Sequence, residues 1–414
     1  GSDQESWVVF GRVLCGNNSP QTMGACCSSE KDAPMNAHQV DQSHFTMMKV
    51  VGKGGFGKVN AVTHRSSNTL MAMKRMKKSK LITKKMYVVT AWRERDVMAQ
   101  LKSPFLVNLL YAFQDETDLF LIMPFMQGGD LRYFLTQKGR MQEDQMCFYA
   151  SEVIMGLEEL HSLNVVYRDL KPDNLLLDSE GHLRISDFGL AVILKKENDY
   201  KVSGGAGTPG YQAPEVLKRQ KYGISADYWS LGITLYELLE RQRPFHSDEE
   251  VLSFQKVVFH HKVSSEAKSL VRGLLNPDPD KRLGCGPGGI DELKKHPFFK
   301  DTDWTVVHDR KQTPPFLPDL DRANCLADHE LQDQFFAEKK EAPLTTEQQK
   351  AFEGYEFNTE LSGASNNSTV VTVHKNHSVT NSVNNSQEGS SEKPSSSGAD
   401  SDTAGKDAAA APKS

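Results

Sequence analysis

One octapeptide governs the interpretation of this chain: Tyr167-Arg168-Asp169-Leu170-Lys171-Pro172-Asp173-Asn174. A segment that reads as a short hairpin separates it from a second motif, Asp187-Phe188-Gly189. The first motif contains the Asp169 carboxylate, the Lys171 ammonium and the Asn174 amide. The second motif contains the Asp187 carboxylate. The oxygen atoms of Asn174 and Asp187 are ligands of the kind that Mg²⁺ prefers. Any one of these carboxylates alone would most often be a surface or helix-capping group. Their order and spacing favour a shared catalytic role.

The two motifs resemble the catalytic loop and the metal-binding motif of protein kinases. Phosphoryl transfer asks the protein mainly to position an acceptor hydroxyl and to screen charge on the transferring group. The resemblance implies that Asp169 is the catalytic base and that Lys171 faces the γ-phosphate of ATP. It also implies that Asn174 and Asp187 hold Mg²⁺, or Mn²⁺ in its place. Lys171 is typical of kinases that act on serine and threonine, and Leu190 favours serine.

A glycine-rich segment precedes this site: Gly52-Lys53-Gly54-Gly55-Phe56-Gly57-Lys58-Val59. Its glycines allow backbone amides to approach a chain of phosphates closely. A dinucleotide-binding motif would need a helix to open at Gly57. The residues from Lys58 to Met73 instead read as two alternating strands around the polar turn Arg65-Ser66-Ser67-Asn68. We therefore expect a hairpin that covers the phosphates of a nucleotide.

A single lysine stands at the end of the second of these strands, in Met71-Ala72-Met73-Lys74. An ammonium at such a position needs anionic partners, because an unpaired charge is costly to bury. Phosphate oxygens and the carboxylate of Glu94, on the following helix, are the expected partners; a solvated helix charge is the equally frequent alternative for Glu94. The residues expected to bind ATP are Gly52, Lys53, Gly54, Gly55, Phe56, Gly57, Val59, Ala72, Lys74, Met123, Pro124, Met126 and Asp130.

The hydrophobic pattern predicts an α+β protein with two lobes, and the resemblance implies that this is the bilobal protein kinase fold. Strand-like alternation over 50–74 gives way to helical stretches over 142–162 and 228–240, which indicates a small β-rich lobe and a larger helical lobe. The predicted kinase domain covers 45–299, with the small lobe at 45–122, the hinge at 123–129 and the large lobe at 130–299. A flexible segment at 1–44 precedes it, and an extension at 300–360 follows. The Ser- and Asn-rich residues 361–414 are predicted to be disordered.

A segment downstream resembles the peptide-positioning segment of kinases. Its sequence is Gly207-Thr208-Pro209-Gly210-Tyr211-Gln212-Ala213-Pro214-Glu215. By this resemblance Thr208 is a catalytic-site residue that bonds near Asp169. Two further motif residues match structural positions of kinases: Asp227 would brace the catalytic loop, and Arg282 would pair with Glu215.

The C-terminal extension resembles that of the AGC group of kinases, as do Tyr167 and the segment from Lys281 to Phe299. It begins at Pro314-Pro315-Phe316 and includes the aromatic segment Asp333-Gln334-Phe335-Phe336. It ends in Phe352-Glu353-Gly354-Tyr355-Glu356-Phe357, similar to the hydrophobic motif whose aromatic residues dock on the small lobe. The expected regulatory residues are Phe352, Tyr355, Glu356 and Phe357. Glu356 places a permanent carboxylate where many members of the group carry a phosphate. The tail resembles that of protein kinase C, which makes Thr345 or Thr346 a candidate phosphosite.

The activation loop departs from the usual AGC pattern, because Gly204 stands three residues before Gly207 where a phosphorylated threonine is usual. Arg168, which would meet that phosphate, is expected to see phospho-Ser203 or no phosphate. This feature resembles G-protein-coupled receptor kinases, although no large regulatory domain precedes Phe45 in this sequence. The carboxylates of Asp130, Asp173 and Glu237 stand where kinases selective for basic peptides bind substrate arginines.

Composition excludes several classes of protein. The formal net charge of −5 gives no electrostatic reason to expect a nucleic-acid partner, and the six scattered cysteines favour a reducing, cytoplasmic setting. No apolar run reaches the roughly 20 residues that a bilayer requires. We expect a monomer whose partners are ATP and protein substrates.

A lipid-attachment motif lies near the start, in Met23-Gly24-Ala25-Cys26-Cys27-Ser28. If Met23 starts the natural protein, Gly24 is a myristoylation site with Cys26 or Cys27 as a palmitoylated second anchor, which would place the protein at the inner face of the plasma membrane. The basic run from Lys74 to Lys85 could assist there, but it reads better as a solvated face of the small lobe.

Two alternatives to an active serine/threonine kinase remain. A pseudokinase that serves as a nucleotide-gated scaffold is disfavoured, because Lys74, Asp169, Asn174 and Asp187 are all present. A kinase of small molecules is disfavoured by the peptide-positioning segment.

Overall fold

The computed structural model describes residues 40–53, 56–320 and 343–359 of the 414. All of them lie within one unit, Gly1–Thr369. Several expectations fall outside the described residues: the acylation site at Gly24, Cys26 and Cys27, the glycines Gly54 and Gly55, the aromatic segment at 333–336, and the tail at 361–414.

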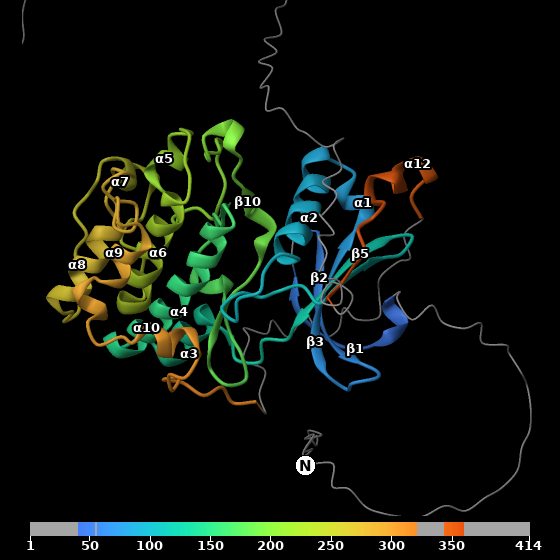
Figure 1. The fold of residues 1–414 in the computed structure, drawn as a ribbon, viewed down its shortest axis with the longest axis horizontal. Helices are drawn as coiled ribbons and strands as arrows, with labels where there is room; N and C mark the ends of the chain where they lie inside the picture. The colour runs from blue at the N-terminus through green and yellow to red at the C-terminus, as the bar shows by residue number, and fades with distance from the viewer. Residues whose placement is uncertain (1–39, 54–55, 321–342, 360–414) are drawn as a thin grey trace, which may run out of the picture. The chain divides into compact units, whose positions relative to one another are not determined.

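A six-stranded antiparallel sheet forms the N-terminal part (Figure 1), with strand order β1-β2-β3-β5-β4-β11. Its strands are β1 Phe45–Lys53, β2 Gly57–His64, β3 Leu70–Lys77, β4 Tyr111–Gln114, β5 Asp118–Pro124 and β11 Phe357–Asn358. On one face, alternate residues such as Val62, Met73 and Phe120 form an apolar cluster. The helices α1 Lys78–Leu81 and α2 Lys85–Met98 follow β3.

A helical part follows the sheet (Figure 1). Its helices are α3 Leu131–Lys138, α4 Glu143–Ser162, α5 Pro214–Leu217, α6 Ser225–Glu240, α7 Asp248–Leu252, α8 Ser265–Leu274, α9 Ile290–Lys294 and α10 Trp304–His308. Short strands before α5 carry the functional loops. β7 Val165–Val166 pairs with β10 Val192–Ile193. β6 Gly129–Asp130, which directly precedes α3, joins β8 Leu175–Leu177 and β9 Leu183–Ile185. The 3₁₀ turns are η1 Gln42–His44, η2 Pro172–Asn174, η3 Phe188–Leu190, η4 Lys196–Asn198, η5 Pro297–Phe299 and η6 Lys350–Phe352.

The centre of the helical part is α6, a helix that is apolar on nearly every side. All of its residues from Ala226 to Glu240 are buried, as expected for a helix surrounded by others. The predicted α+β class with a sheet lobe and a helical lobe is confirmed. The link between the lobes runs from the end of β5 at Pro124 to β6, which starts at Gly129.

The glycine-rich segment joins β1 to β2, so a strand and not a helix begins at Gly57. Gly57 pairs with Met76 of β3, and a Cβ atom added to it would lie 1.6 Å from the carbonyl oxygen of Arg75. Only glycine fits this contact between backbones. The hairpin interpretation therefore holds over the dinucleotide-binding alternative.

Candidate active site

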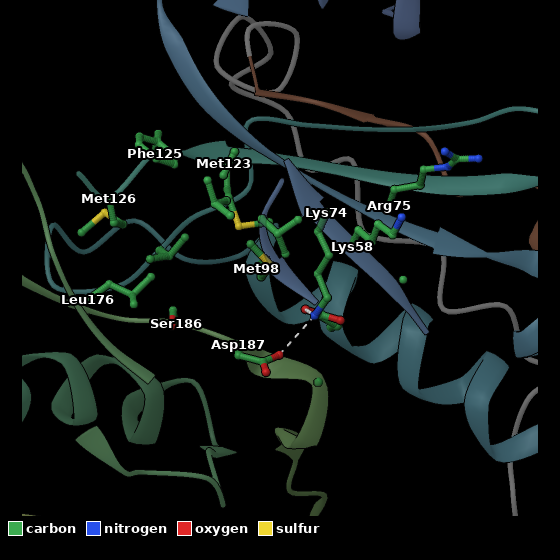
Figure 2. A pocket seen from close by; sticks show the side chains of 18 of the residues that line it. Lys58, Lys74, Arg75, Met98, Met123, Phe125, Met126, Leu176, Ser186 and Asp187 are labelled. Carbon is green, nitrogen blue, oxygen red and sulfur yellow. Dashed lines mark hydrogen bonds and ion pairs between the residues drawn. The ribbon is translucent and has the colours of Figure 1, made fainter. Parts of the chain in front are cut away.

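A cavity of about 630 Å³ opens beside the sheet and is bounded by β1–β3, α2, β5, β6 and the loops before and after η2 (Figure 2). This volume is within the range of small-molecule sites. The predicted site residues that line the cavity are Gly52, Phe56, Gly57, Val59, Ala72, Lys74, Glu94, Met123, Pro124, Met126, Asp130, Asp169 and Asp187. Lys53 ends β1. Sequence reasoning missed the apolar lining residues Val51, Met98, Val107 and Leu176, whose ordinary core-like character gives no signal.

Lys74 projects from β3 into the cavity toward Asp187 (Figure 2). Its Nζ lies 2.5 Å from Glu94 Oε1 and 3.2 Å from Asp187 Oδ1. Burial disfavours the ammonium, but the charges of Asp187 and Glu94 outweigh it and raise the pKa of Lys74. The lysine therefore stays charged. The bond to Glu94 also links β3 to α2.

Asp187 is held in an unusual backbone conformation at φ 55°. A non-glycine residue in the left-handed region is strained unless its surroundings fix it, and such residues cluster at functional sites. The Lys74 ammonium lowers the pKa of Asp187, and the backbone N–H of Gly189 contributes. The side chain is nonetheless 52% exposed, so an ionised carboxylate faces the cavity.

The carboxylate of Asp169 is oriented by four donors. Its Oδ1 accepts from the Thr208 backbone N at 3.0 Å and from Thr208 Oγ1 at 2.6 Å. Its Oδ2 accepts from Lys171 Nζ and Asn174 Nδ2, both at 2.9 Å. Lys171 Nζ also donates to Thr208 Oγ1 at 2.7 Å. This network joins the catalytic-loop residues Asp169, Lys171 and Asn174 to Thr208 of the peptide-positioning segment.

Asp227 braces the loop that carries Asp169. Its carboxylate is buried and accepts from the backbone N of Tyr167 at 2.9 Å and of Arg168 at 2.7 Å. His161 Nε2 lies 2.9 Å from the same carboxylate. These bonds hold Arg168 at φ 72°, again in the left-handed region. His161 is a partner that sequence reasoning missed, since it lies on α4 without a motif around it.

The second structural pair joins Arg282 to Glu215. Arg282 Nη1 and Nη2 donate to the two carboxylate oxygens of Glu215 at 2.7 and 3.0 Å. Arg282 Nε and Nη1 also donate to the carbonyl oxygens of Asn276 and Ser225. Both side chains are buried, so this bidentate ion pair lies away from solvent.

Arg168 contacts both ends of the segment 190–222. Its Nε donates to the Leu190 carbonyl oxygen at 2.7 Å, and Nη1 donates to the Tyr222 hydroxyl at 3.1 Å. Ser203 is exposed on this segment. Phosphorylation of Ser203 stays a prediction.

The hydrophobic motif docks on the sheet lobe. Phe352 and Tyr355 are buried, and the Tyr355 ring meets Trp92 of α2 edge-on at 5.3 Å between centroids. Arg95 of α2 donates to the carbonyl oxygens of Tyr355 and Glu356 at 3.3 and 2.7 Å. Phe357 belongs to β11 and pairs with Ala112 of β4. The tail therefore contacts the helix that carries Glu94.

The side chain of Glu356 has its own partner, which sequence reasoning missed. Gln114 Nε2 donates to Glu356 Oε1 at 2.8 Å and to the Phe352 carbonyl oxygen at 2.8 Å. Thr345 caps α12 Thr346–Gln349, accepting from the Gln348 backbone N at 3.3 Å. Its phosphorylation stays a prediction.

Lys78 corrects the interpretation of the basic run as a solvated face. It is 1% exposed, and its Nζ donates to the Asp115 carbonyl oxygen and to Gln349 Oε1, both at 2.6 Å. Its ammonium also lies 5.3 Å from the centroid of the Phe352 ring. Lys78 is thus a tether for the C-terminal segment, which lies beside α1 in Figure 1.

Two negative findings apply to the described ranges only. Within 40–53, 56–320 and 343–359, no group of three or more His, Cys, Asp or Glu side chains could hold a metal ion. None of the helices in this same part of the chain combines the length and apolar character needed to cross a membrane.

Comparison with known proteins places these features in context. The family described as the protein kinase domain matches residues 45–299. A probable serine/threonine-protein kinase of Dictyostelium discoideum is 39% identical over 373 residues, which cover 86% of this chain and 80% of that protein. Human ribosomal protein S6 kinase alpha-1 is 41% identical over 292 residues (68% of this chain, 39% of the relative). Human rhodopsin kinase is 39% identical over 298 residues (69% and 53%). The chain thus spans about half or less of these last two.

Proposed function

The chain belongs to the protein kinase family as a serine/threonine kinase, and on that premise we propose that it transfers the γ-phosphate of Mg-ATP to protein substrates with Asp169 as base. The observation that carries this proposal is the placement of Asp169 and the Lys74–Asp187 pair on the walls of one cavity. The expected AGC-group resemblance is confirmed by relatives of that group.

The donor set fits Mg-ATP. Asp187 presents an ionised carboxylate, and Asn174 donates through its Nδ2, which leaves its carbonyl oxygen as an acceptor. Mg²⁺ is bound in proteins by one or two such oxygens, with phosphates and waters completing its shell, so the absence of a cluster of three His, Cys, Asp or Glu side chains among the described residues is no obstacle. Bound there, Mg²⁺ or Mn²⁺ would neutralise charge on the phosphates.

The chain's own residues would divide the remaining work. Lys74 would contact phosphate oxygens while Glu94 fixes its position. Asp169 would accept a hydrogen bond from the acceptor hydroxyl, and Lys171 would offset negative charge beside it. Gly57 lines the cavity on the β1–β2 hairpin, and its close contact with the Arg75 backbone of β3 leaves no room for a larger residue. The apolar side chains of the cavity would hold the adenine ring of ATP.

The test is transfer of phosphate from Mg-ATP to serine and threonine peptides by the wild type and by Asp187→Asn. Loss of the metal-facing charge should lower kcat/KM by at least about 10²-fold, since a metal ion contributes several kcal/mol. Asp301→Asn removes an exposed carboxylate that does not line the cavity and should retain activity. Equal background transfer by all three proteins would favour the scaffold alternative.

We also propose that the kinase works without an activation-loop phosphate and that its tail holds α2 in place. Gly204 supports the first point, and the bonds from Arg95 support the second. Glu356→Ala keeps the backbone acceptor of Arg95 but loses the bond from Gln114, so unfolding free energy should fall by about 0.5–1.5 kcal/mol. Glu353→Ala, also exposed in the tail, is the control. Equal stability of the two variants would count against a docking role for the carboxylate.

The location follows as a separate proposal. We propose that the protein is cytoplasmic and, where Met23 starts the natural chain, attached to the inner face of the plasma membrane through acyl groups at Gly24 and Cys26 or Cys27. A Met23-start chain co-expressed with an N-myristoyltransferase should gain one myristoyl mass, and Gly24→Ala should not. An unmodified mass in both would remove this proposal.

A further inference from the structure

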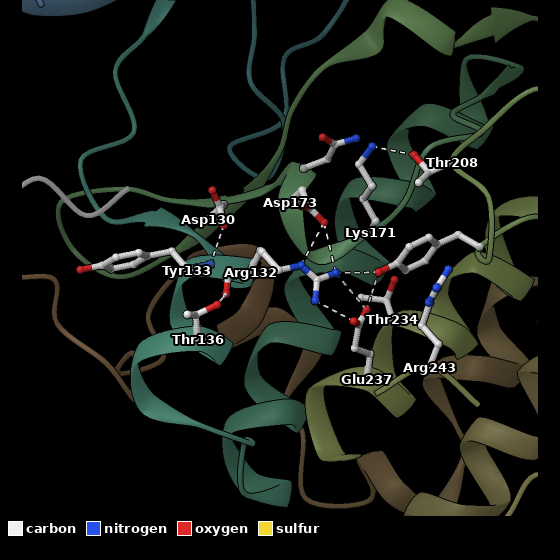
Figure 3. A network of polar contacts seen from close by, with 12 residues as sticks. Asp130, Arg132, Tyr133, Thr136, Lys171, Asp173, Thr208, Thr234, Glu237 and Arg243 are labelled. Carbon is white, nitrogen blue, oxygen red and sulfur yellow. Dashed lines mark hydrogen bonds and ion pairs between the residues drawn. The ribbon is translucent and has the colours of Figure 1, made fainter. Parts of the chain in front are cut away.

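An arginine of the chain itself sits among the carboxylates that border the catalytic loop (Figure 3). Arg132, on α3, points between Asp173 and Glu237. Its Nη1 lies 2.6 Å from Glu237 Oε1, and its Nη2 lies 3.2 Å from Glu237 Oε2. Its Nε and Nη2 lie 3.4 and 3.3 Å from Asp173 Oδ2. One guanidinium thus binds two carboxylates at once.

Both carboxylate oxygens of Glu237 accept hydrogen bonds in this arrangement. Oε1 accepts from Arg132, and Oε2 accepts from Arg132 and from the Tyr211 hydroxyl. Tyr211 in turn accepts from Arg132 Nη2 at 2.7 Å. The Glu237 side chain is 7% exposed, whereas that of Arg132 is 29% exposed. The carboxylate therefore lies at the closed end of the cluster, with the arginine between it and solvent.

The cluster lies where an acceptor peptide has to pass. Asp173 immediately precedes Asn174, and both Asp130 and Asp173 line the same cavity as Asp169. Tyr211 comes three residues after Thr208, whose hydroxyl and N–H bind Asp169. A peptide that presents a hydroxyl to Asp169 must cross this boundary between the catalytic loop and the peptide-positioning segment.

A second cation of the chain reaches the same segment. Arg243 Nη1 donates to the Pro209 carbonyl oxygen at 2.9 Å, and its guanidinium lies 5.9 Å from the centroid of the Tyr211 ring. Burial disfavours the charge of Arg132, but Glu237, Tyr211 and Asp173 outweigh it and raise the pKa of Arg132. The guanidinium of Arg132 therefore stays charged.

We propose that Arg132 is a specificity-determining residue: it fills the Asp173–Glu237 carboxylate site in place of a substrate arginine, so that this kinase does not select arginine-containing peptides. The proposal rests on the proposed kinase function and revises the sequence-based expectation of basic substrates. The proposal predicts that the preferred peptides carry neutral or acidic residues at the position that faces Glu237.

The physical reason is that a substrate arginine and Arg132 would make equivalent bonds to the same carboxylates. An incoming arginine would have to displace Arg132, and the carboxylates would gain only what they lose. Arg132 is attached to the same chain, so its effective concentration at Glu237 exceeds that of any free peptide. Like charge on Arg132 and Arg243 further opposes a cationic peptide, and such repulsion is an effective source of discrimination.

The experiment uses pairs of serine peptides that differ only by arginine or its neutral isostere citrulline, placed in turn at each position before the serine. For each pair, the ratio of kcat/KM and the ratio of peptide dissociation constants are measured on the full chain. The wild-type ratios should be near one or favour citrulline. Arg132→Gln should shift both ratios toward arginine by at least about tenfold at one position, which is about 1.4 kcal/mol.

Three further variants make the result specific. Arg132→Lys keeps the cation and should stay near the wild-type ratios. Arg132→Gln combined with Glu237→Gln should lose the new preference. Arg65→Ala, which removes an exposed arginine from the β2–β3 turn, should change nothing. If Arg132→Gln does not fold, Glu237→Gln alone gives the complementary test. It should not lower the preference for arginine over citrulline peptides, and a loss confined to arginine peptides would overturn the role of Arg132.

The binding ratios separate this inference from the proposed function. A shift of the binding ratio without phosphate transfer by any variant supports the role of Arg132 and overturns the kinase assignment. A wild type that already prefers arginine tenfold, or an Arg132→Gln variant whose ratios equal those of the wild type, overturns the role of Arg132.

Discussion

Two arginine–glutamate pairs flank the segment from Gly207 to Glu215, and they differ in their access to solvent. Arg282 and Glu215 have side-chain exposures of 0% and 4%, whereas Arg132 and Glu237 have 29% and 7%. Both pairs use two guanidinium nitrogens on the two oxygens of one carboxylate. The same pairing chemistry is therefore sealed from solvent in one place and accessible to solvent in the other.

The other partners of each arginine explain the difference. Arg282 completes its bonds on backbone carbonyl oxygens and lies 5.3 Å from the centroid of the Trp229 ring, all groups that the core holds still. Arg132 completes its bonds on the side chains of Asp173 and Tyr211. Asp173 is 46% exposed and can turn toward solvent or a ligand.

The largest expected effect comes from breaking the buried ion pair between Arg282 and Glu215. Arg282→Ala leaves Glu215 as an unpaired buried charge, which costs about 3–5 kcal/mol of unfolding free energy. Equilibrium denaturation in urea measures this loss. Replacing both members by apolar residues, as Arg282→Met with Glu215→Leu, should restore most of the stability. A loss below about 1 kcal/mol in the single variant would show that water reaches Glu215.

Opening the outer pair should cost less. Arg132→Ala removes bonds to the charged Glu237 but leaves the Tyr211 hydroxyl as its donor, so we expect a loss of about 1–3 kcal/mol. The same denaturation experiment applies, with Arg65→Ala as the control for loss of an arginine charge. A loss as large as that of Arg282→Ala would erase the distinction between the two pairs.

Salt should produce the smallest effect and the clearest contrast. Raising ionic strength from 0.1 to 1 M shortens the Debye length from about 10 to about 3 Å, which weakens exposed charge pairs more than buried ones. Double-mutant cycles at both salt concentrations give the coupling energy of each pair. The coupling of Arg132 to Glu237 should fall by a few tenths of a kcal/mol, about the size of a surface pair. Equal salt dependence of both couplings would contradict the exposures.

The sequence predicted those contacts whose partners stand in ordered motifs. Lys74 with Glu94, Thr208 with Asp169, and Arg282 with Glu215 all meet in the structure as the resemblance implied. The bilobal fold followed from the change in hydrophobic period. Each of these predictions used residues whose type and order together leave few alternatives.

Arg132 and Lys78 show where that reasoning ends. The carboxylate partners of Arg132 lie 41 and 105 residues away, so its local sequence is that of any exposed helical arginine. Lys78 stands in a basic run, and one of its acceptors is a backbone carbonyl oxygen, which no residue type reveals. Its other acceptor, Gln349, belongs to the tail and is 271 residues away.

The short strand β11 has a consequence for solubility. It pairs with β4 at Phe357 and Ala112, and at Asn358 and Tyr111, and so covers the edge of β4 that the other five strands leave open. An uncovered edge offers free backbone groups to strands of other molecules and invites aggregation. The tail that contacts α2 thus also shields the edge of β4 from other molecules. We therefore expect a chain cut before Tyr355 to expose the edge of β4 to aggregation and to lose the contacts that hold α2.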